Sequence, residues 1–145
     1  MKIFSGTNYK SLTNQIFTEL TQIISISDYG YSLGELQIDK FSDGELLPCF
    51  KESIRDEDIF FGNSTDSSDS IVETMLVIDA AKRAGCKSFT LVAPFQGYSR
   101  QDKTDHLRSS IGSKALAITL ERLGLSRLIT IDLHASSIQG FYEIP

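Results

Sequence analysis

The chain has 145 residues, a length typical of a single domain. Its hydrophobic content of 41% and charged content of 23% are ordinary for a globular protein with a buried core. The formal net charge of -5 argues against a general nucleic-acid-binding or anionic-membrane surface. Any bound anion must therefore meet a few well-placed cations and backbone amides.

The amino terminus has no signal-like pattern, because the apolar start of the chain leads directly into Ser5 and Gly6. Cys49 and Cys86 make no zinc-binding pattern, so we expect them to be reduced thiols. No apolar run approaches the ~20 residues that span a bilayer. These features predict a soluble cytoplasmic protein with neither a membrane nor a nucleic-acid partner.

The first part of the chain predicts alternating strands and helices. Lys2–Phe4 is expected to form a short strand, and the apolar spacing over Tyr9–Ile24 predicts an amphipathic helix. Ser32–Phe41 alternates loosely and is expected to be extended, and Glu57–Asn63 predicts a compact strand. The polar stretch Ser64–Ser70 then favours a functional loop over a linker, because short polar segments between a strand and a helix often carry binding residues.

A helix is predicted after this loop. Ser70 and Glu73 fit a capping box for a helix over Ile71–Ala84. Gly85 suits the left-handed position that ends such a helix.

The same order is then repeated. The pattern predicts a strand at Ser88–Ala93, a helix at Ser113–Leu123 closed by Gly124, and a strand at Arg127–Leu133. Both strands are nearly unbroken apolar runs, as in parallel strands that are buried on both faces. The sequence therefore predicts an α/β fold with a parallel sheet and helices on both faces, whose ligands gather at the carboxyl ends of the strands.

Three polar clusters carry the candidate chemistry. Asp132 and His134 lie two positions apart, which in a strand places both side chains on one face, where a hard cation could bind them. Such a pair is more often structural. Tyr98–Lys103 follows another apolar strand, and Phe41–Glu45 lies earlier. Taken alone, Phe41–Glu45 reads as a turn with an Asp-Gly signal and Arg100–Asp105 as a solvated charged loop.

Together these clusters resemble the amino-terminal half of ribose-phosphate pyrophosphokinase, also called phosphoribosyl pyrophosphate synthetase. The resemblance includes Lys2–Gly6, Ile111–Lys114 and the run Ile138–Phe141, and it extends in order over essentially the whole chain. It implies a three-layer parallel-sheet domain of the phosphoribosyltransferase-like type. It also implies transfer of a diphosphate group from Mg-ATP to ribose 5-phosphate, which yields phosphoribosyl pyrophosphate and AMP for nucleotide biosynthesis.

The resemblance also implies the site residues. ATP contacts are expected from two loops: Phe41, Asp43, Gly44, Glu45, Arg100, Gln101, Asp102, Lys103 and Asp105. Phe41 is expected against the adenine, across a subunit boundary. Mg²⁺ is expected at His134, Asp132 and Glu143, and no catalytic residue is expected in this half. The planar guanidinium of Arg100 suits phosphate oxygens, and a charge-assisted hydrogen bond contributes roughly 1.5–3 kcal/mol.

The family's carboxy-terminal half does not occur in this chain. That half binds ribose 5-phosphate and carries a mobile cationic loop, and one missing transition-state cation can cost ~10³–10⁵ in rate. We therefore expect the chain alone to bind nucleotide weakly and to turn over negligibly. The family also assembles as homo-oligomers, commonly hexamers built from dimers.

Several positions depart from the family pattern. Ser68–Ser70 replaces an Asn-Asp-Asn run, Ser110–Lys114 lacks a proline, and Gln96 is unusual before the Arg-Gln-Asp motif. These departures concern loop rigidity and allosteric control by phosphate or ADP. Two other functions stay open: a non-catalytic nucleotide-binding or regulatory subunit of a synthetase assembly, and a generic receiver- or nucleotide-binding α/β domain.

Overall fold

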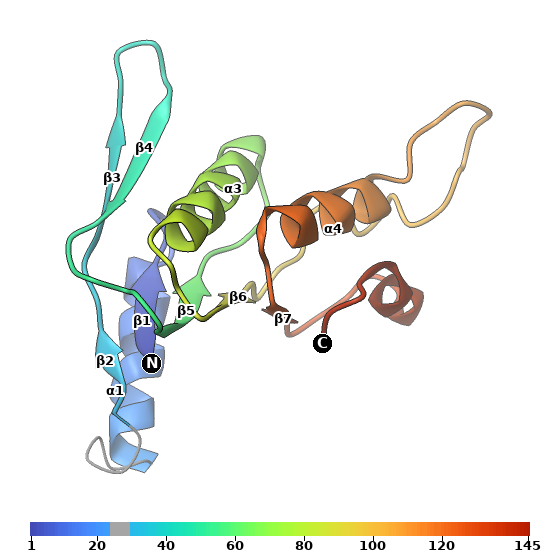
Figure 1. Cartoon of the computed structure of the whole chain (residues 1–145). Coiled ribbons are helices and arrows are strands. Elements are labelled where there is room, and N and C mark those ends of the chain that lie inside the picture. The colour runs from blue at the N-terminus through green and yellow to red at the C-terminus, as the bar shows by residue number, and fades with distance from the viewer. Residues whose placement is uncertain (24–29) are drawn as a thin grey trace.

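The structure, a computed structural model, describes residues 1–23 and 30–145 (Figure 1). Five parallel strands form one sheet in the order β2-β1-β5-β6-β7, and two antiparallel strands, β3 and β4, form a separate hairpin. The elements in chain order are β1 (Lys2–Ser5), α1 (Lys10–Ile23), β2 (Ser32–Leu33), β3 (Leu36–Lys40), β4 (Leu46–Phe50), β5 (Asp58–Gly62), α3 (Ser68–Arg83), β6 (Ser88–Val92), α4 (Gly112–Leu123), β7 (Arg127–Ile129) and the 3-10 helix η1 (Ser136–Phe141).

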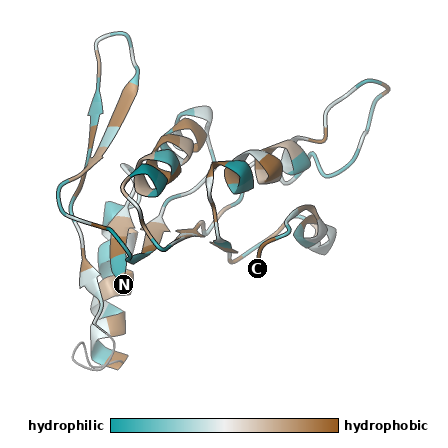
Figure 2. Cartoon of the chain, viewed as in Figure 1, coloured by the Kyte–Doolittle hydropathy of each residue, from teal (hydrophilic) through white to brown (hydrophobic). Residues whose placement is uncertain are grey.

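The main core lies between the sheet and helices α3 and α4. Phe61 and Leu91 on the central strands are fully buried, as are Val77 on α3 and Ala117 on α4. Burying a side chain the size of Val77 or Leu91 contributes roughly 1.5–3 kcal/mol. Figure 2 shows apolar and polar residues alternating around both helices, as expected when one helix face is buried.

Helix α1 covers the opposite face of the sheet. Gly62 follows Phe61 on β5 and so faces away from the main core. A side chain at Gly62 would collide with Thr13 of α1, which shows how closely that helix approaches. Helices therefore lie on both faces (Figure 1), and the predicted α/β three-layer arrangement is confirmed. The last residue of the predicted first helix, Ile24, lies outside the described residues.

Helix α3 begins three residues earlier than predicted. Ser67, not Ser70, is the N-cap, and its hydroxyl accepts a 3.1 Å hydrogen bond from the backbone N–H of Ser70. Glu73 does not complete a capping box, because its carboxylate accepts hydrogen bonds from the N–H and hydroxyl of Thr7 at 2.8 and 2.7 Å. The capping-box prediction is therefore wrong, whereas Gly85 has the predicted left-handed conformation, with φ +78°.

The extended segment 32–41 divides into β2 and β3, and β3 pairs with a strand that the sequence did not predict, β4. Pro48 lies within β4, and a proline in an apolar run is not typical of a strand interior. The resulting hairpin extends away from the sheet, and β4 lies against α3 (Figure 1). Gly44 closes the hairpin with φ +97°, a conformation that favours glycine.

The last strand, β7, is shorter than predicted and is not buried on both faces. It ends at Ile129, which is 42% exposed, and Ile131 beyond it is 84% exposed. The reason is that β7 lies at the edge of the sheet, so one side of the strand lacks a neighbouring strand within the described residues. In residues 1–23 and 30–145, no helix is long and apolar enough to cross a membrane.

Candidate functional site

A pocket of about 560 Å³ opens at the carboxyl ends of β5, β6 and β7. We call it the carboxyl-edge pocket. Three loops form it, one after each strand, and its lining residues are Thr65, Asp66, Ser67, Ser68, Phe95, Gln96, Gly97, Tyr98, Ser99, Arg100, Gln101, Asp132 and His134. Parallel α/β sheets bind their ligands at this edge. The predicted place of the site therefore coincides with a pocket.

Hydrogen bonds join two walls of the pocket. The hydroxyl of Thr65 accepts a hydrogen bond of 2.8 Å from the N–H of Gly97, and the hydroxyl of Ser64 donates to the carbonyl of Phe95 at 2.8 Å. The backbone N–H of Thr65 also donates to Phe95 O. A Cβ at Gly97 would overlap the carbonyl group of Thr65. The loops after β5 and β6 therefore form one connected wall.

Arg100 and Gln101 stand on a tight turn of this wall. Tyr98 has φ +57°, and the Gln101 N–H donates to the Tyr98 carbonyl at 2.9 Å. The hydroxyl of Ser99 donates to the carbonyl of Gln96 at 2.7 Å, so the base of the turn is fixed. Arg100 is exposed and forms no ion pair within the described part of the chain. Its guanidinium donors are therefore free to bind phosphate oxygens.

The start of α4 supports Gln101. The carbonyl of Gln101 accepts a 3.2 Å hydrogen bond from the N–H of Ser113. A Cβ at Gly112 would lie 2.5 Å from Oε1 of Gln101, so the glycine lets the side chain rest directly on the helix start. These contacts fix the base of the loop that precedes α4, although the segment lacks the family's proline.

Asp132 and His134 both line the pocket, but not for the predicted reason. The strand ends at Ile129, so the two-residue strand period does not orient them. Asp132 instead pairs with Phe95 in an isolated parallel bridge, which brings the segment after β7 to the loop after β6. One carboxylate and one imidazole fit Mg²⁺, which takes few protein ligands and keeps several waters.

Glu143 does not join this pair. It does not line the carboxyl-edge pocket, and its backbone N–H donates to the Glu121 carboxylate at 2.8 Å. Among residues 1–23 and 30–145, no three His, Cys, Asp or Glu side chains are grouped so as to hold a metal ion. The residues present suit a metal held mainly by phosphate and water, and the structure does not bring Glu143 to it.

The amino-terminal end of α3 also reaches the pocket. Ser67 and Ser68 line it, and the first turn of a helix carries free N–H groups and a partial positive charge that favour anions. Phe95 and Tyr98 add aromatic surface and are 56% and 46% exposed. The sequence marked the loop Ser64–Ser70 as functional, from its run of small polar residues, and placed Tyr98 in a candidate polar cluster. Neither Ser67 nor Ser68 was assigned a role in binding, and Phe95 was not a candidate.

The other predicted nucleotide contacts lie outside the carboxyl-edge pocket. Asp102, Lys103 and Asp105 belong to the loop before α4, where Lys103 and Asp105 form an exposed pair at 4.0 Å. Phe41, Asp43, Gly44 and Glu45 form the tip of the β3–β4 hairpin, where the Glu45 N–H donates to the Asp43 carboxylate at 3.1 Å. Phe41 is 52% exposed. Figure 1 shows the hairpin tip and the loop before α4 on opposite sides of the molecule.

Gln96 closes the back of the pocket and is almost fully buried. Its amide Nε2 donates to the hydroxyl of Tyr142 at 3.0 Å. Burial, and then the charge of Glu121, raise the pKa of Tyr142, so its hydroxyl stays protonated and neutral. Tyr142 also packs against the main core.

A parallel sheet covered by helices, with a polar pocket at the carboxyl ends of its strands, defines an α/β domain with a candidate ligand site at the sheet edge. A sequence model described as the N-terminal domain of ribose phosphate pyrophosphokinase matches residues 1–124. The chain therefore belongs to the ribose-phosphate pyrophosphokinase family.

Comparison with individual relatives supports this family assignment. The chain is 45% identical over 144 residues to "Ribose-phosphate pyrophosphokinase" of Porphyromonas gingivalis, covering 99% of this chain and 43% of that protein. It is 42% identical over 147 residues to the protein of the same name from Corynebacterium ammoniagenes, covering 44% of it. A crystal structure of phosphoribosylpyrophosphate synthetase from Mycobacterium smegmatis matches with a TM-score of 0.85 and 29% identity, over 99% of this chain and 46% of that one. The chain thus spans less than half the length of these relatives.

Proposed function

We propose that this chain is the ATP-binding half of a ribose-phosphate diphosphokinase. The complete enzyme transfers the diphosphate group of Mg-ATP to ribose 5-phosphate and releases phosphoribosyl pyrophosphate and AMP. The observation that carries the proposal is the carboxyl-edge pocket, which brings Arg100, Gln101, Asp132 and His134 together from two loops that are separate in the sequence. Family membership supports a shared role for these four residues in binding the nucleotide.

The pocket offers separate groups to the phosphates and to the metal ion. Arg100 offers a fork of donors to phosphate oxygens, and the amino-terminal end of α3 adds further N–H groups at the same place. Asp132 and His134 would hold Mg²⁺ directly or through water. The metal neutralises phosphate charge and fixes the orientation of the polyphosphate. These residues bind and orient the nucleotide, and this half supplies no acid, base or nucleophile.

The adenine contacts are assigned to a second copy of the chain. Phe41 is exposed at the hairpin tip, and neither it nor Asp43 and Glu45 line the pocket of their own chain. A hairpin that extends from the body can reach a neighbouring copy, where Phe41 would stack on the base. We propose a homo-oligomer built from dimers, assembling to a hexamer in the complete cytoplasmic enzyme.

A second function is a non-catalytic nucleotide-binding or regulatory subunit of a synthetase assembly. Such a subunit would use the same carboxyl-edge pocket without turnover.

Phosphorus NMR of the purified chain with Mg-ATP, before and after addition of ribose 5-phosphate, tests the proposal. Shifted or broadened ATP signals without AMP or phosphoribosyl pyrophosphate are expected for an ATP-binding half. Formation of both products would show that this chain suffices for catalysis. ATP signals that stay unchanged at millimolar protein would contradict nucleotide binding at this pocket.

A further inference from the structure

Strand β7 has one edge that carries almost no hydrogen bonds. The carbonyl of Ile129 accepts a 2.8 Å hydrogen bond from the N–H of Ala93, so the backbone groups of Ile129 face β6. Because these groups alternate along a strand, those of Leu128 and Thr130 face the opposite, free edge. In the described part of the chain this edge has one backbone hydrogen bond, from the N–H of Leu128 to the carbonyl of Pro145 at 3.0 Å.

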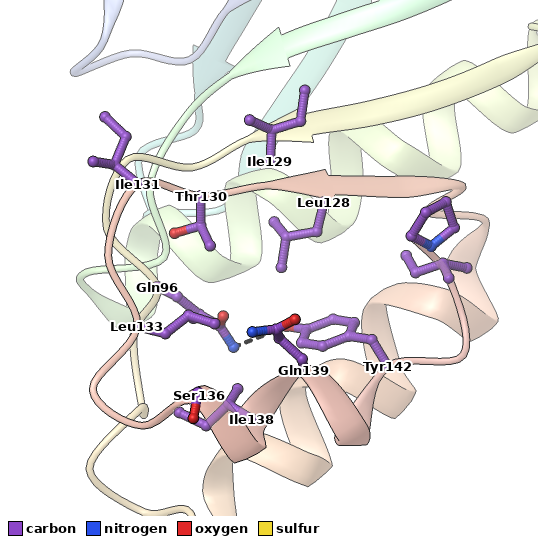
Figure 3. A pocket seen from close by; sticks show the side chains of 12 residues that line it. Gln96, Leu128, Ile129, Thr130, Ile131, Leu133, Ser136, Ile138, Gln139 and Tyr142 are labelled. Carbon is purple, nitrogen blue, oxygen red and sulfur yellow. Dashed lines mark hydrogen bonds between the residues drawn. The ribbon is translucent and has the colours of Figure 1, made fainter.

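An apolar pocket of about 690 Å³ lies beside this edge, between β7 and η1 (Figure 3). We call it the edge pocket. Most of its wall is apolar. The apolar side chains that line it include Leu128, Ile131, Leu133, Ile138, Tyr142 and Ile144. A solvent-exposed apolar surface next to an unpaired strand edge is what proteins normally cover.

We infer that β7 is an interior strand in the complete enzyme. An extended, mainly apolar segment, from the part of the enzyme that follows the matched region in the relatives, pairs with the free edge and fills the edge pocket. A segment that enters beside Pro145 passes Leu128 first and Thr130 second, so it runs parallel to β7. The inference rests on the proposed function only in taking this chain as the amino-terminal part of a longer enzyme.

Two observations favour a segment of the complete enzyme as the occupant of the edge pocket. The relatives have more than half of their length outside the region that this chain matches. In this chain, Ile144 and Pro145 already lie on the wall of the edge pocket. A polypeptide attached there reaches the free edge with little loss of entropy, because the ends to be joined are already close.

Hydrogen–deuterium exchange tests the inference. The 145-residue chain is compared with a fusion in which the part of the Porphyromonas gingivalis relative that follows the matched region is attached to Pro145. The backbone N–H of Thr130 should exchange at least about tenfold more slowly in the fusion, because it gains a strand partner. The N–H of Phe61 on β5 is the internal reference and should exchange equally in both. Equal exchange at Thr130 would overturn the inference.

A matched pair of substitutions provides a second readout. Ile131→Asp should lower the melting temperature of the fusion but leave that of the 145-residue chain unchanged, because Ile131 is 84% exposed in the latter. Ile23→Asp, at a side chain that is 77% exposed on α1, should change neither protein. An Ile131→Asp effect no larger in the fusion than in the short chain contradicts the inference.

The remaining outcomes are also decisive. Slow exchange at Thr130 that appears in the 145-residue chain with rising concentration would show that a second copy covers the edge, and the inference would be wrong. If the fusion does not fold, the two parts are co-expressed as separate chains, and failure to co-purify counts against it. Exchange needs no nucleotide, so a fusion that protects Thr130 but binds no Mg-ATP would overturn the proposed function and leave this inference standing.

Discussion

Thr65 and Gly97 join two loops of the carboxyl-edge pocket. The hydroxyl of Thr65 accepts a 2.8 Å hydrogen bond from the N–H of Gly97, and the two backbones approach so closely that no side chain fits at position 97. Both residues are buried. This contact sets the distance between the amino-terminal end of α3 and the turn that carries Arg100.

Replacing Gly97 by Ala should therefore destabilise the protein. The added methyl group must displace the Thr65 carbonyl, and overpacking of this kind costs about 1–3 kcal/mol. Gly140→Ala is the matched control, because no atom lies within 4 Å of a Cβ at that position. Urea unfolding of both variants measures the difference. Equal free energies of unfolding would show that the two loops separate easily.

Replacing Arg100 by Ala should weaken Mg-ATP binding about tenfold or more, because one charge-assisted contact with phosphate is lost. Isothermal titration calorimetry measures the affinity. Arg83→Ala removes an equal charge from an exposed pair with Asp79 on α3, far from the pocket lining, and should have no effect. Unchanged affinity in the Arg100 variant would contradict the assignment of this loop.

Replacing Asp132 by Asn or His134 by Ala should weaken binding of the metal–nucleotide complex, by about tenfold for a lost ligand or its orienting partner. Binding of ATP without metal should change much less. Mn²⁺ can stand in for Mg²⁺, and its paramagnetic broadening of amide signals near both residues reports the metal directly. The Glu143→Gln variant should broaden like the wild type, because Glu143 does not line the pocket. Broadening that persists without Asp132 and His134 would place the metal elsewhere.

Replacing Phe41 by Ala should reduce nucleotide affinity only in the assembled protein. Stacking of an aromatic ring on a base contributes about 1–3 kcal/mol, and the hairpin tip does not line the pocket of its own chain. Leu47→Ala on the same hairpin is the control, since Leu47 is similarly exposed at 48%. Affinity is measured together with mass by analytical ultracentrifugation. A loss of affinity in the monomer would refute the placement across a subunit boundary.

Acid should destabilise the sheet through Asp58. The hydroxyl of Ser88 at 2.6 Å, and then the ammonium of Lys87 at 3.0 Å, lower the pKa of the Asp58 carboxyl. Because the pKa is lower in the folded than in the unfolded state, this stabilisation is present above the unfolded value of about 4. It is lost as the pH falls through the lower folded value. Ser88→Ala should reduce the loss of stability between pH 5 and the folded pKa, measured by thermal unfolding. An unchanged acid profile would show that the hydrogen bond between Ser88 and Asp58 does not contribute.

The fold was largely predictable from local patterns. The spacing of apolar residues in α3 and α4, the unbroken apolar run of β6 and the glycines at 85 and 124 each depend on neighbours close in sequence. Hydrophobic periodicity and turn chemistry act over that range. Where the predictions failed, a distant contact changed the outcome. Glu73 binds Thr7 instead of capping α3, and β7 is exposed because it lies at an edge.

The candidate site shows the same division. The sequence by itself determined the types of side chain, a guanidinium, an amide, a carboxylate and an imidazole, and their position after apolar strands. Only the tertiary structure decided which of them share a pocket. It placed Arg100 and Asp132 together, left Glu143 outside, and put Phe41 at the tip of a hairpin. Strand order in a sheet is set by packing and hydrogen bonds between segments that are far apart in the chain, and no local sequence pattern encodes those contacts.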